Sequence, residues 1–115
     1  MQEIWDVLDH NGRKTGRTVA RSQHAALGNG EYMLAVHIYI VNSRGEWLVQ
    51  KRSETKEHFP GIWDITGGAV LSGEESLDAA LRETKEELGI TLQRENLRCI
   101  ARLLREKSFV DFWLA

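Results

Sequence analysis

The sequence predicts an α+β domain in which several short strands accompany one helix. Runs of β-branched and aromatic residues are bounded by turn residues, and one long segment repeats its apolar residues at helical spacing. The 115 residues are enough for one hydrophobic core. No internal repeat, linker or low-complexity segment interrupts the chain. We therefore expect a single domain spanning residues 1–115.

The N-terminal half is predicted to be mostly strand. Residues 3–9 and 13–19 alternate apolar and polar side chains around a turn rich in Asn and Gly, which predicts a β-hairpin. Residues 20–31 contain a Gly-Asn-Gly sequence and are predicted to form a loop. Residues 33–41 have the composition of a buried strand, and a turn then leads to a second strand at 46–51.

Three further strands are predicted on either side of the helix. A short strand at 63–66 leads into a pair of glycines, and strands at 97–104 and 108–114 follow the helix. The last of these is strand-like to its end, with no turn or polar tail. We expect the C-terminal part of the domain, with a partner for this strand and a covering helix, to lie beyond residue 115.

The helix is predicted to run from Ser72 to Leu88. The Ser72 hydroxyl can cap its first turn while Glu75, three residues later, reaches back in a capping box. Gly89 suits the left-handed position that follows a helix. An apolar stripe on this helix is expected to face a sheet, and it is formed by Leu77, Leu81, Thr84 and Leu88.

Composition and charge exclude several classes of protein. With 42% hydrophobic and 28% charged residues the chain has an ordinary globular composition. A net charge of −2 argues against binding to nucleic-acid polymers, which requires a basic surface. Cys99 is the only cysteine, so an internal disulfide and a CxxC zinc site are excluded. No signal peptide or membrane-spanning segment is visible, and we expect a cytoplasmic protein.

Three carboxylates gather on one side of the predicted helix. Glu83, Glu86 and Glu87 stand at positions i, i+3 and i+4, where like charges repel by a few tenths of a kcal/mol per pair. They also lie in the C-terminal half, where the helix dipole disfavours anions. Such a group of hard oxygen donors is what Mg²⁺ requires. Taken alone, the same spacing is more typical of a solvated acidic helix face.

The wider pattern distinguishes these two readings. Gly68 is followed after five residues by Glu74, and after seven more by Arg82-Glu83-Thr84-Lys85-Glu86-Glu87-Leu88-Gly89-Ile90. This stretch resembles the Nudix box. Every fixed position of that motif is filled, by Gly68, Glu74, Arg82, Glu83, Glu86, Glu87 and Gly89. The one departure is Thr84, which stands where the motif has an aliphatic residue and whose methyl group can still pack inward.

The resemblance implies a fold and a metal site. The Nudix fold is an α/β/α sandwich with a mixed sheet, in which the box forms a loop-helix-loop. By resemblance, Glu83, Glu86 and Glu87 bind Mg²⁺ or Mn²⁺ together with the Gly67 carbonyl. The metal lowers the pKa of an attacking water, and Glu83 is the candidate base, although some Nudix branches place the base in a loop after the box.

Residues around this site have mechanical roles in the prediction. Arg82 is expected to hold Glu83 by a bidentate contact. Gly67 and Gly68 are expected to permit a tight turn that brings a carbonyl close to the metal. Together with Glu83, Arg82 is therefore a candidate catalytic residue.

Segments outside the box resemble the Nudix branch related to isopentenyl diphosphate isomerase. They are the N-terminal hairpin, the strand end at Lys51 and Arg52, residues 59–64 and the Thr66-Gly67-Gly68 sequence. Lys51 and Arg52 are candidates for binding substrate phosphates, although a solvated strand end explains them equally well. His37 stands where the isomerases place a metal-binding histidine, but a histidine in such a run is more often part of one face of a half-exposed strand.

Three functions are compatible with the sequence. The first is a metal-dependent hydrolase that cleaves a diphosphate bond in a nucleoside diphosphate derivative or a similar small diphosphate. The second is an isopentenyl diphosphate isomerase, a family that has a cysteine just before the box glycine, where this chain has Gly67. The third is a non-catalytic Nudix module, although such proteins usually lose the box carboxylates. The oligomeric state is open, with a homodimer as one option.

Overall fold

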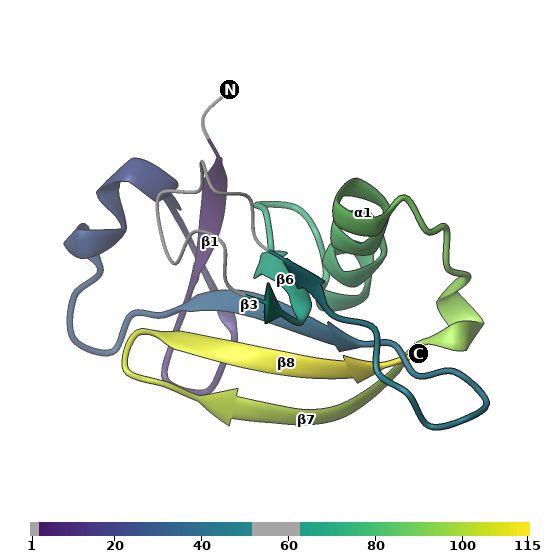
Figure 1. Cartoon of the computed structure of the whole chain (residues 1–115). Coiled ribbons are helices and arrows are strands. Elements are labelled where there is room, and N and C mark those ends of the chain that lie inside the picture. Colours follow the sequence, from purple (N-terminus) through teal and green to yellow (C-terminus); the bar gives the residue numbers. More distant parts are fainter. Residues whose placement is uncertain (1–2, 52–62) are drawn as a thin grey trace.

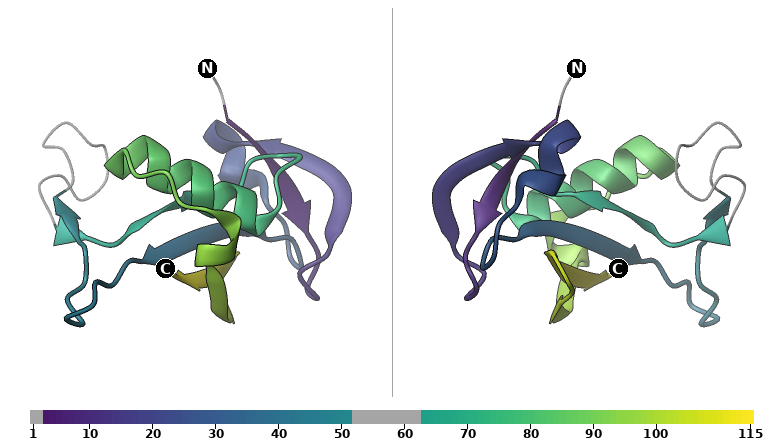
Figure 2. Two further views of the ribbon diagram at one scale, coloured as in Figure 1. Left: turned by 90° about the vertical axis from the view of Figure 1, so that its right-hand side faces the viewer. Right: turned by 90° about the vertical axis from the view of Figure 1, so that its left-hand side faces the viewer.

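The computed structural model describes residues 3–51 and 63–115, with the backbone alone for 24–26 and Lys51. A four-stranded mixed sheet in the order β6-β3-β8-β7 forms its centre, helix α1 lies on one face, and an N-terminal hairpin packs beside it (Figures 1 and 2). The expected fold class, α+β with a mixed sheet and a helical layer, is confirmed. The central elements are β3 (Met33–Tyr39), β6 (Thr66–Ala69), α1 (Ser76–Leu88), β7 (Arg98–Leu104) and β8 (Ser108–Leu114).

The sheet places β6 at an edge. β3 pairs in parallel with β8 and antiparallel with β6, while β7 and β8 pair antiparallel. The Val70 N–H donates to the Leu34 carbonyl at 2.9 Å, and hydrogen-bonded pairs in an antiparallel ladder recur every two residues. Gly67 and Ala69 therefore turn their N–H and C=O groups away from β3. This outer edge of β6 faces helix α1.

The predicted N-terminal hairpin is confirmed. Strands β1 (Ile4–Leu8) and β2 (Lys14–Ala20) pair antiparallel. The hairpin is joined to the start of β3 by two reciprocal backbone hydrogen bonds between Leu8 and Tyr32, at 2.7 and 3.0 Å. The predicted loop after the hairpin is partly wrong, because it contains the 3₁₀ helix η1 (Arg21–Ala26).

The strands flanking the turn after β3 are shorter than predicted. The segment 46–51 forms an isolated bridge at Trp47 and the two-residue strand β4 (Gln50–Lys51), which pairs with β5 (Trp63–Asp64). Trp47 is 58% exposed, so little burial favours a longer ladder here. The predicted strand 63–66 is interrupted at Ile65, whose N–H donates to the Asp64 carboxylate at 2.7 Å instead of to a neighbouring strand.

Helix α1 begins later than predicted. Ser72 is not its cap, because the Ser72 hydroxyl donates to the Asp6 carboxylate at 2.9 Å. Glu75 is the N-cap instead and forms a capping box with Asp78. The end of the helix is as predicted, since Gly89 adopts the left-handed conformation with φ of 71°.

The core lies between the helix and the sheet. It is formed by the buried residues Val36, Ile38, Val70, Ala79, Ala80 and Leu97. Leu77 and Leu81 pack against it, as the predicted apolar stripe requires. Thr84 is fully buried, and its hydroxyl donates to the Ala80 carbonyl at 2.8 Å, so the departure from the aliphatic motif position leaves no polar atom unpaired.

The final strand is central in the sheet. β8 was expected to lack a partner, but it pairs with β3 on one side and β7 on the other. Its buried Asp111 accepts two hydrogen bonds from Arg102 of β7, at 2.5 and 2.8 Å. In the described ranges no helix is long and apolar enough to cross a bilayer.

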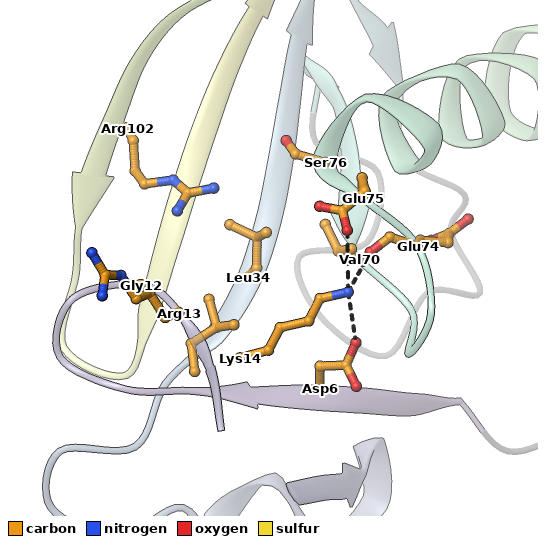
Figure 3. A pocket seen from close by; sticks show the side chains of 11 residues that line it. Asp6, Gly12, Arg13, Lys14, Leu34, Val70, Glu74, Glu75, Ser76 and Arg102 are labelled. Atoms are coloured by element: carbon orange, nitrogen blue, oxygen red, sulfur yellow. Dashed lines mark hydrogen bonds and ion pairs between the residues drawn. The ribbon is translucent and has the colours of Figure 1, made fainter. Parts of the chain in front are cut away.

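Asp6 connects the hairpin to the loop before α1. Its carboxylate accepts hydrogen bonds from the Ser72 hydroxyl and the Gly73 N–H. Lys14 lies 3.4 Å from the same carboxylate (Figure 3). Partial burial opposes the charged form, but the hydrogen bonds from Gly73, Ser72 and Lys14 outweigh it and lower the pKa of Asp6. Lys14 extends the link by reaching Glu75 at the helix N-terminus, 3.5 Å away.

We expect Asp6→Asn to destabilise the protein by about 1–2 kcal/mol, because it weakens several charge-assisted hydrogen bonds. The loss should be present at neutral pH and should disappear as the pH falls through the lowered pKa of Asp6, where the carboxylate also loses its charge. Urea unfolding at several pH values measures this. Asp9→Asn is the control, since the pKa of Asp9 is lowered as well, but by hydrogen bonds from the Arg13 and Asn11 N–H groups within the hairpin turn. Equal effects of both substitutions at all pH values would contradict the role of Asp6.

Candidate functional site

A cleft of about 530 Å³ lies over the outer edge of β6, between α1 and the N-terminal hairpin. Figure 1 shows the three elements around this position. The cleft is lined by Glu83, Glu86 and Glu87 of α1, by Gly67, Gly68 and Ala69 of β6, by Met33 of β3, and by Glu3, Trp5 and Arg21. The three carboxylates that the sequence placed on one helix face therefore share one cleft.

Arg82 organises the carboxylates of the box. Its Nε and Nη2 donate to both oxygens of Glu74, at 2.7 and 3.0 Å. Its Nη1 donates to Glu83 at 2.8 Å and to Glu86 at 3.2 Å, and its Nη2 also reaches the Ala69 carbonyl. The expected bidentate contact is thus made with Glu74, while Glu83 receives one hydrogen bond. No role for Glu74 was predicted, because it lies eight positions before Arg82 in the sequence and the loop before α1 brings the two together.

The box glycine is required for a close approach. A Cβ atom built on Gly68 would overlap the Glu83 carboxylate, and one on Gly67 would lie 2.5 Å from the Val36 carbonyl oxygen. The two glycines belong to strand β6, so the predicted tight turn is wrong. Glycine is needed here because the helix carboxylate and the neighbouring strand leave no room for a side chain.

The three glutamates are held by two sets of donors. Glu87 accepts hydrogen bonds from the Gln50 side chain at 2.7 Å and from the Gly67 N–H at 3.2 Å, whereas Glu83 and Glu86 share Arg82. Among the described residues no three His, Cys, Asp or Glu side chains stand close enough together to hold a metal ion. The carboxylates therefore line one cleft without converging, as mutual repulsion favours.

The donor set nevertheless fits a hard divalent cation. Three carboxylates face the cleft, and the Gly67 carbonyl points to the same outer edge of β6. The Glu86 side chain is 58% exposed, so it can turn toward a cation at little cost in packing. A cation would replace the repulsion among the three charges by attraction.

Glu83 is the most perturbed acid in the cleft. Burial raises the pKa of Glu83 to about 7, against the opposing hydrogen bond and charge of Arg82, and the charges of Glu87 and Glu86 add to the rise. A carboxyl with a pKa near neutrality can take up and release a proton under working conditions. The hydrogen bonds to Glu74 and Glu83 raise the pKa of Arg82, which therefore stays charged.

A second hollow of about 210 Å³ lies beside the cleft and contains His37, Gln50 and Asp64. Burial and the charge of Arg105 lower the pKa of His37, although Asp64 opposes this. His37 makes an edge contact with the Phe112 ring and belongs to no metal-ligand cluster among the described residues.

The two predicted phosphate-binding residues are only partly placed. Lys51 ends strand β4, but its side chain is not described, and Arg52 lies outside the described residues. A further pocket of about 280 Å³ lies between the hairpin turn and the N-terminus of α1 (Figure 3). Of the box carboxylates it contains only Glu74, and Lys14 crosses it, so it is separate from the cleft.

Comparison with known proteins places the chain among Nudix sequences. A family model for the NUDIX domain matches residues 31–115. An uncharacterized Nudix hydrolase of Listeria innocua is 42% identical over 112 residues, which cover 96% of this chain and 65% of the relative. An isopentenyl-diphosphate delta-isomerase of Pectobacterium atrosepticum is 38% identical over 85 residues, covering 73% of this chain and 46% of the isomerase. The chain thus spans slightly less than two thirds of the Listeria protein.

Solved structures show the same similarity. A hypothetical Nudix protein from Deinococcus radiodurans superposes with a TM-score of 0.80 at 28% identity, covering 97% of this chain and 70% of that one. MutT, analysed from Aliivibrio salmonicida and Vibrio cholerae, gives a TM-score of 0.61 at 31% identity, over 72% of this chain and 64% of that one.

Proposed function

Because the chain belongs to the Nudix family, we propose that it hydrolyses a diphosphate bond in a nucleoside diphosphate derivative or a similar small diphosphate. Nudix hydrolases use divalent metals, and we propose Mg²⁺ or Mn²⁺ for this chain. Glu83, Glu86 and Glu87 would hold the cation with the Gly67 carbonyl. The observation that supports this most is the cleft in which these carboxylates face the outer edge of β6.

The residues of the chain then have distinct tasks. The cation, when bound, neutralises the diphosphate and lowers the pKa of the attacking water. Glu83 would accept the proton of that water. Arg82 positions Glu83 through Nη1, and Glu74 holds Arg82 by two hydrogen bonds.

The cleft favours a small substrate. Its volume of about 530 Å³ lies in the range of small-molecule sites. Four glutamates line it and the net charge is −2, so a nucleic-acid polymer with its many phosphates is disfavoured. On the basis of the sequence alone, Lys51 and Arg52 remain proposed partners of the substrate phosphates.

A substrate screen tests the proposed function. Nucleotide sugars, dinucleotides, nucleoside triphosphates and prenyl diphosphates should each be offered to the intact protein with Mg²⁺, with Mn²⁺ and with EDTA. We expect at least one to be split into two phosphorylated products, or into a nucleotide and diphosphate, only when the metal is present. Metal binding without turnover of any of these compounds would instead favour a non-catalytic binding module.

Isomerisation is the competing activity, since an isopentenyl-diphosphate isomerase is among the relatives. The cysteine that such isomerases place before the box glycine is Gly67 here, and the Val36 carbonyl leaves no room for a side chain at that position. Cys99 lies on β7, at the opposite edge of the sheet from β6, and does not line the described cleft. The chain therefore lacks, at this position, the cysteine that the isomerases have for moving a proton across an alkene.

We expect no conversion of isopentenyl diphosphate to dimethylallyl diphosphate with Mg²⁺ or Zn²⁺ present. Product analysis by chromatography after extended incubation measures this, with a known isomerase as the positive control. Detectable turnover that disappears on addition of EDTA would overturn the hydrolase assignment in favour of the isomerase.

A further inference from the structure

The pocket shown in Figure 3 contains two guanidinium groups at one end. It has a volume of about 280 Å³ and lies between the hairpin turn and the start of α1, apart from the cleft. Arg13 enters it from the turn and Arg102 from β7, while Lys14 lies among carboxylates at the other end (Figure 3). Neither arginine has a part in the proposed hydrolysis.

Arg102 is fixed in place with one nitrogen left over. Its Nε and Nη2 donate to the two oxygens of the buried Asp111, at 2.5 and 2.8 Å. Its guanidinium carbon lies 5.9 Å from the centre of the Phe109 ring, a contact that favours the same orientation. The remaining nitrogen, Nη1, makes no hydrogen bond with a described residue and lies beside Gly12, 3.0 Å from where a Cβ atom would stand. Arg102 therefore offers a preorganised donor to the pocket.

Arg13 brings a second guanidinium, whose donors are unused. Its backbone is held in the hairpin turn by Asp9: the Arg13 N–H donates to the Asp9 carboxylate at 3.0 Å, and its carbonyl accepts from the Asp9 N–H at 2.8 Å. The Arg13 guanidinium forms no hydrogen bond or ion pair with another described residue. Two like charges at one end of a pocket repel each other, and an anion bound between them would replace this repulsion by attraction.

The carboxylates that line the pocket already have donors. Asp6 is held by the loop before α1, both oxygens of Glu74 accept from Arg82, and Glu75 caps the helix. Lys14 adds its charge to Asp6 and Glu75 and also reaches the Glu74 carbonyl. Among the described residues that line the pocket, the charged groups with unused donors are therefore the two arginines.

We propose that this pocket is a second binding site, in which Arg13 and Arg102 hold the phosphate group of a small phosphomonoester. A dianionic phosphate has enough oxygens to accept from both guanidinium groups, whose planar donors match its geometry. The carbon part of the ligand lies against the apolar lining of the pocket, formed by Leu8, Leu34 and Val70. The site is independent of the proposed hydrolysis, because none of the proposed metal-binding carboxylates lines it.

Binding of butyl phosphate to the intact protein in the presence of EDTA tests this site. Without a metal, the four carboxylates of the cleft disfavour an anion there, so binding reports on the pocket. An NMR titration of the backbone amides measures the affinity and the location together, and we expect the largest shifts at residues 12–14. Inorganic phosphate and butyrate should each bind about 5- to 10-fold more weakly, because the first lacks the apolar part and the second lacks one charge.

Two substitutions test the two arginines. Arg13→Gln should weaken the binding of butyl phosphate by about 10-fold, since it removes charge-assisted hydrogen bonds, and its exposed side chain makes the fold insensitive to the change. Arg102→Lys keeps a cation for Asp111 but removes Nη1, and it should weaken binding by a similar factor. The melting temperature of each variant shows that the fold is kept.

Arg98→Gln is the matched control. Arg98 lies on β7, as Arg102 does, and is exposed as Arg13 is, but it does not line the pocket. The substitution changes the net charge by the same amount as Arg13→Gln. The variant should bind butyl phosphate within twofold of the wild type.

The contrary outcomes are distinct. Wild-type protein that does not bind butyl phosphate in EDTA, or whose shifts lie around the cleft, would refute the site. Wild-type affinity in Arg13→Gln would refute it too, as would equal weakening in Arg98→Gln, which would indicate a general attraction to positive charge. Equal affinity for butyrate or inorganic phosphate would refute the phosphomonoester as the ligand. Mg²⁺ binding should be the same in all these variants, so a failure to bind metal would count against the proposed function alone.

Discussion

Replacing Glu86 and Glu87 together by glutamine should abolish the rise in melting temperature that Mg²⁺ or Mn²⁺ gives to the metal-free protein. A ligand that binds only the folded state stabilises it by about 2.7 kcal/mol at a concentration one hundred times its Kd. For a domain of this size that is a shift on the order of 10 °C. Glutamine keeps the volume of each side chain and its ability to accept a hydrogen bond from Gln50, but removes the charges that would hold the cation.

The control for this experiment is a charge-matched variant. Glu95→Gln with Glu106→Gln changes the net charge by the same amount at two exposed positions away from the cleft. It should keep the full metal-dependent shift. An undiminished shift in the Glu86/Glu87 variant would show that the metal binds elsewhere and would remove the central support for the proposed site.

Local sequence signals predicted the parts of the fold that local interactions determine. The hairpin, β3, β7, β8 and the end of α1 follow from alternation, turn residues and Gly89. The start of α1 was missed because Asp6, far away in the sequence, takes the Ser72 hydroxyl and the Gly73 N–H. Competition of this kind depends on tertiary structure and leaves no local pattern.

The candidate site, too, has features that the sequence predicted and features that it did not. The helical spacing of Glu83, Glu86 and Glu87 predicted that they share one face, and they do line one cleft. The contacts around them could not be predicted, since Gln50, which donates to Glu87, and Glu74, which accepts from Arg82, reach α1 through the folded loops.

Glu83→Gln should lower kcat by about 10²–10⁴-fold with little change in KM. This is the usual effect of removing a positioned acid or base whose contribution is made in the transition state. Single-turnover and steady-state rates on the substrate found in the screen measure it. Glutamine can still accept the hydrogen bond that Arg82 Nη1 gives to Glu83, so the geometry around Gly68 should be kept.

The stability of the same variant shows whether lost activity comes from lost structure. The raised pKa of Glu83 means that the metal-free folded state holds a proton between about pH 4.5 and 7 that the unfolded chain has released. Stability therefore falls as the pH rises through that window, and the full penalty is present above pH 7. Glu83→Gln removes the penalty and should stabilise the metal-free protein at pH 8 by up to about 3 kcal/mol. A variant that is more stable and yet inactive cannot be explained by unfolding.

Arg82→Ala should show the reverse combination. This substitution should lower kcat less than Glu83→Gln does, because Arg82 acts on the water through Glu83. Its stability should drop by several kcal/mol, since Glu74 and the buried Glu83 lose the guanidinium that pairs with both of them.

If Glu83→Gln instead retains near-full kcat in the intact protein, the base lies in a loop beyond the box. The assignment of Glu83 as the base then fails, while the metal site tested through Glu86 and Glu87 is unaffected.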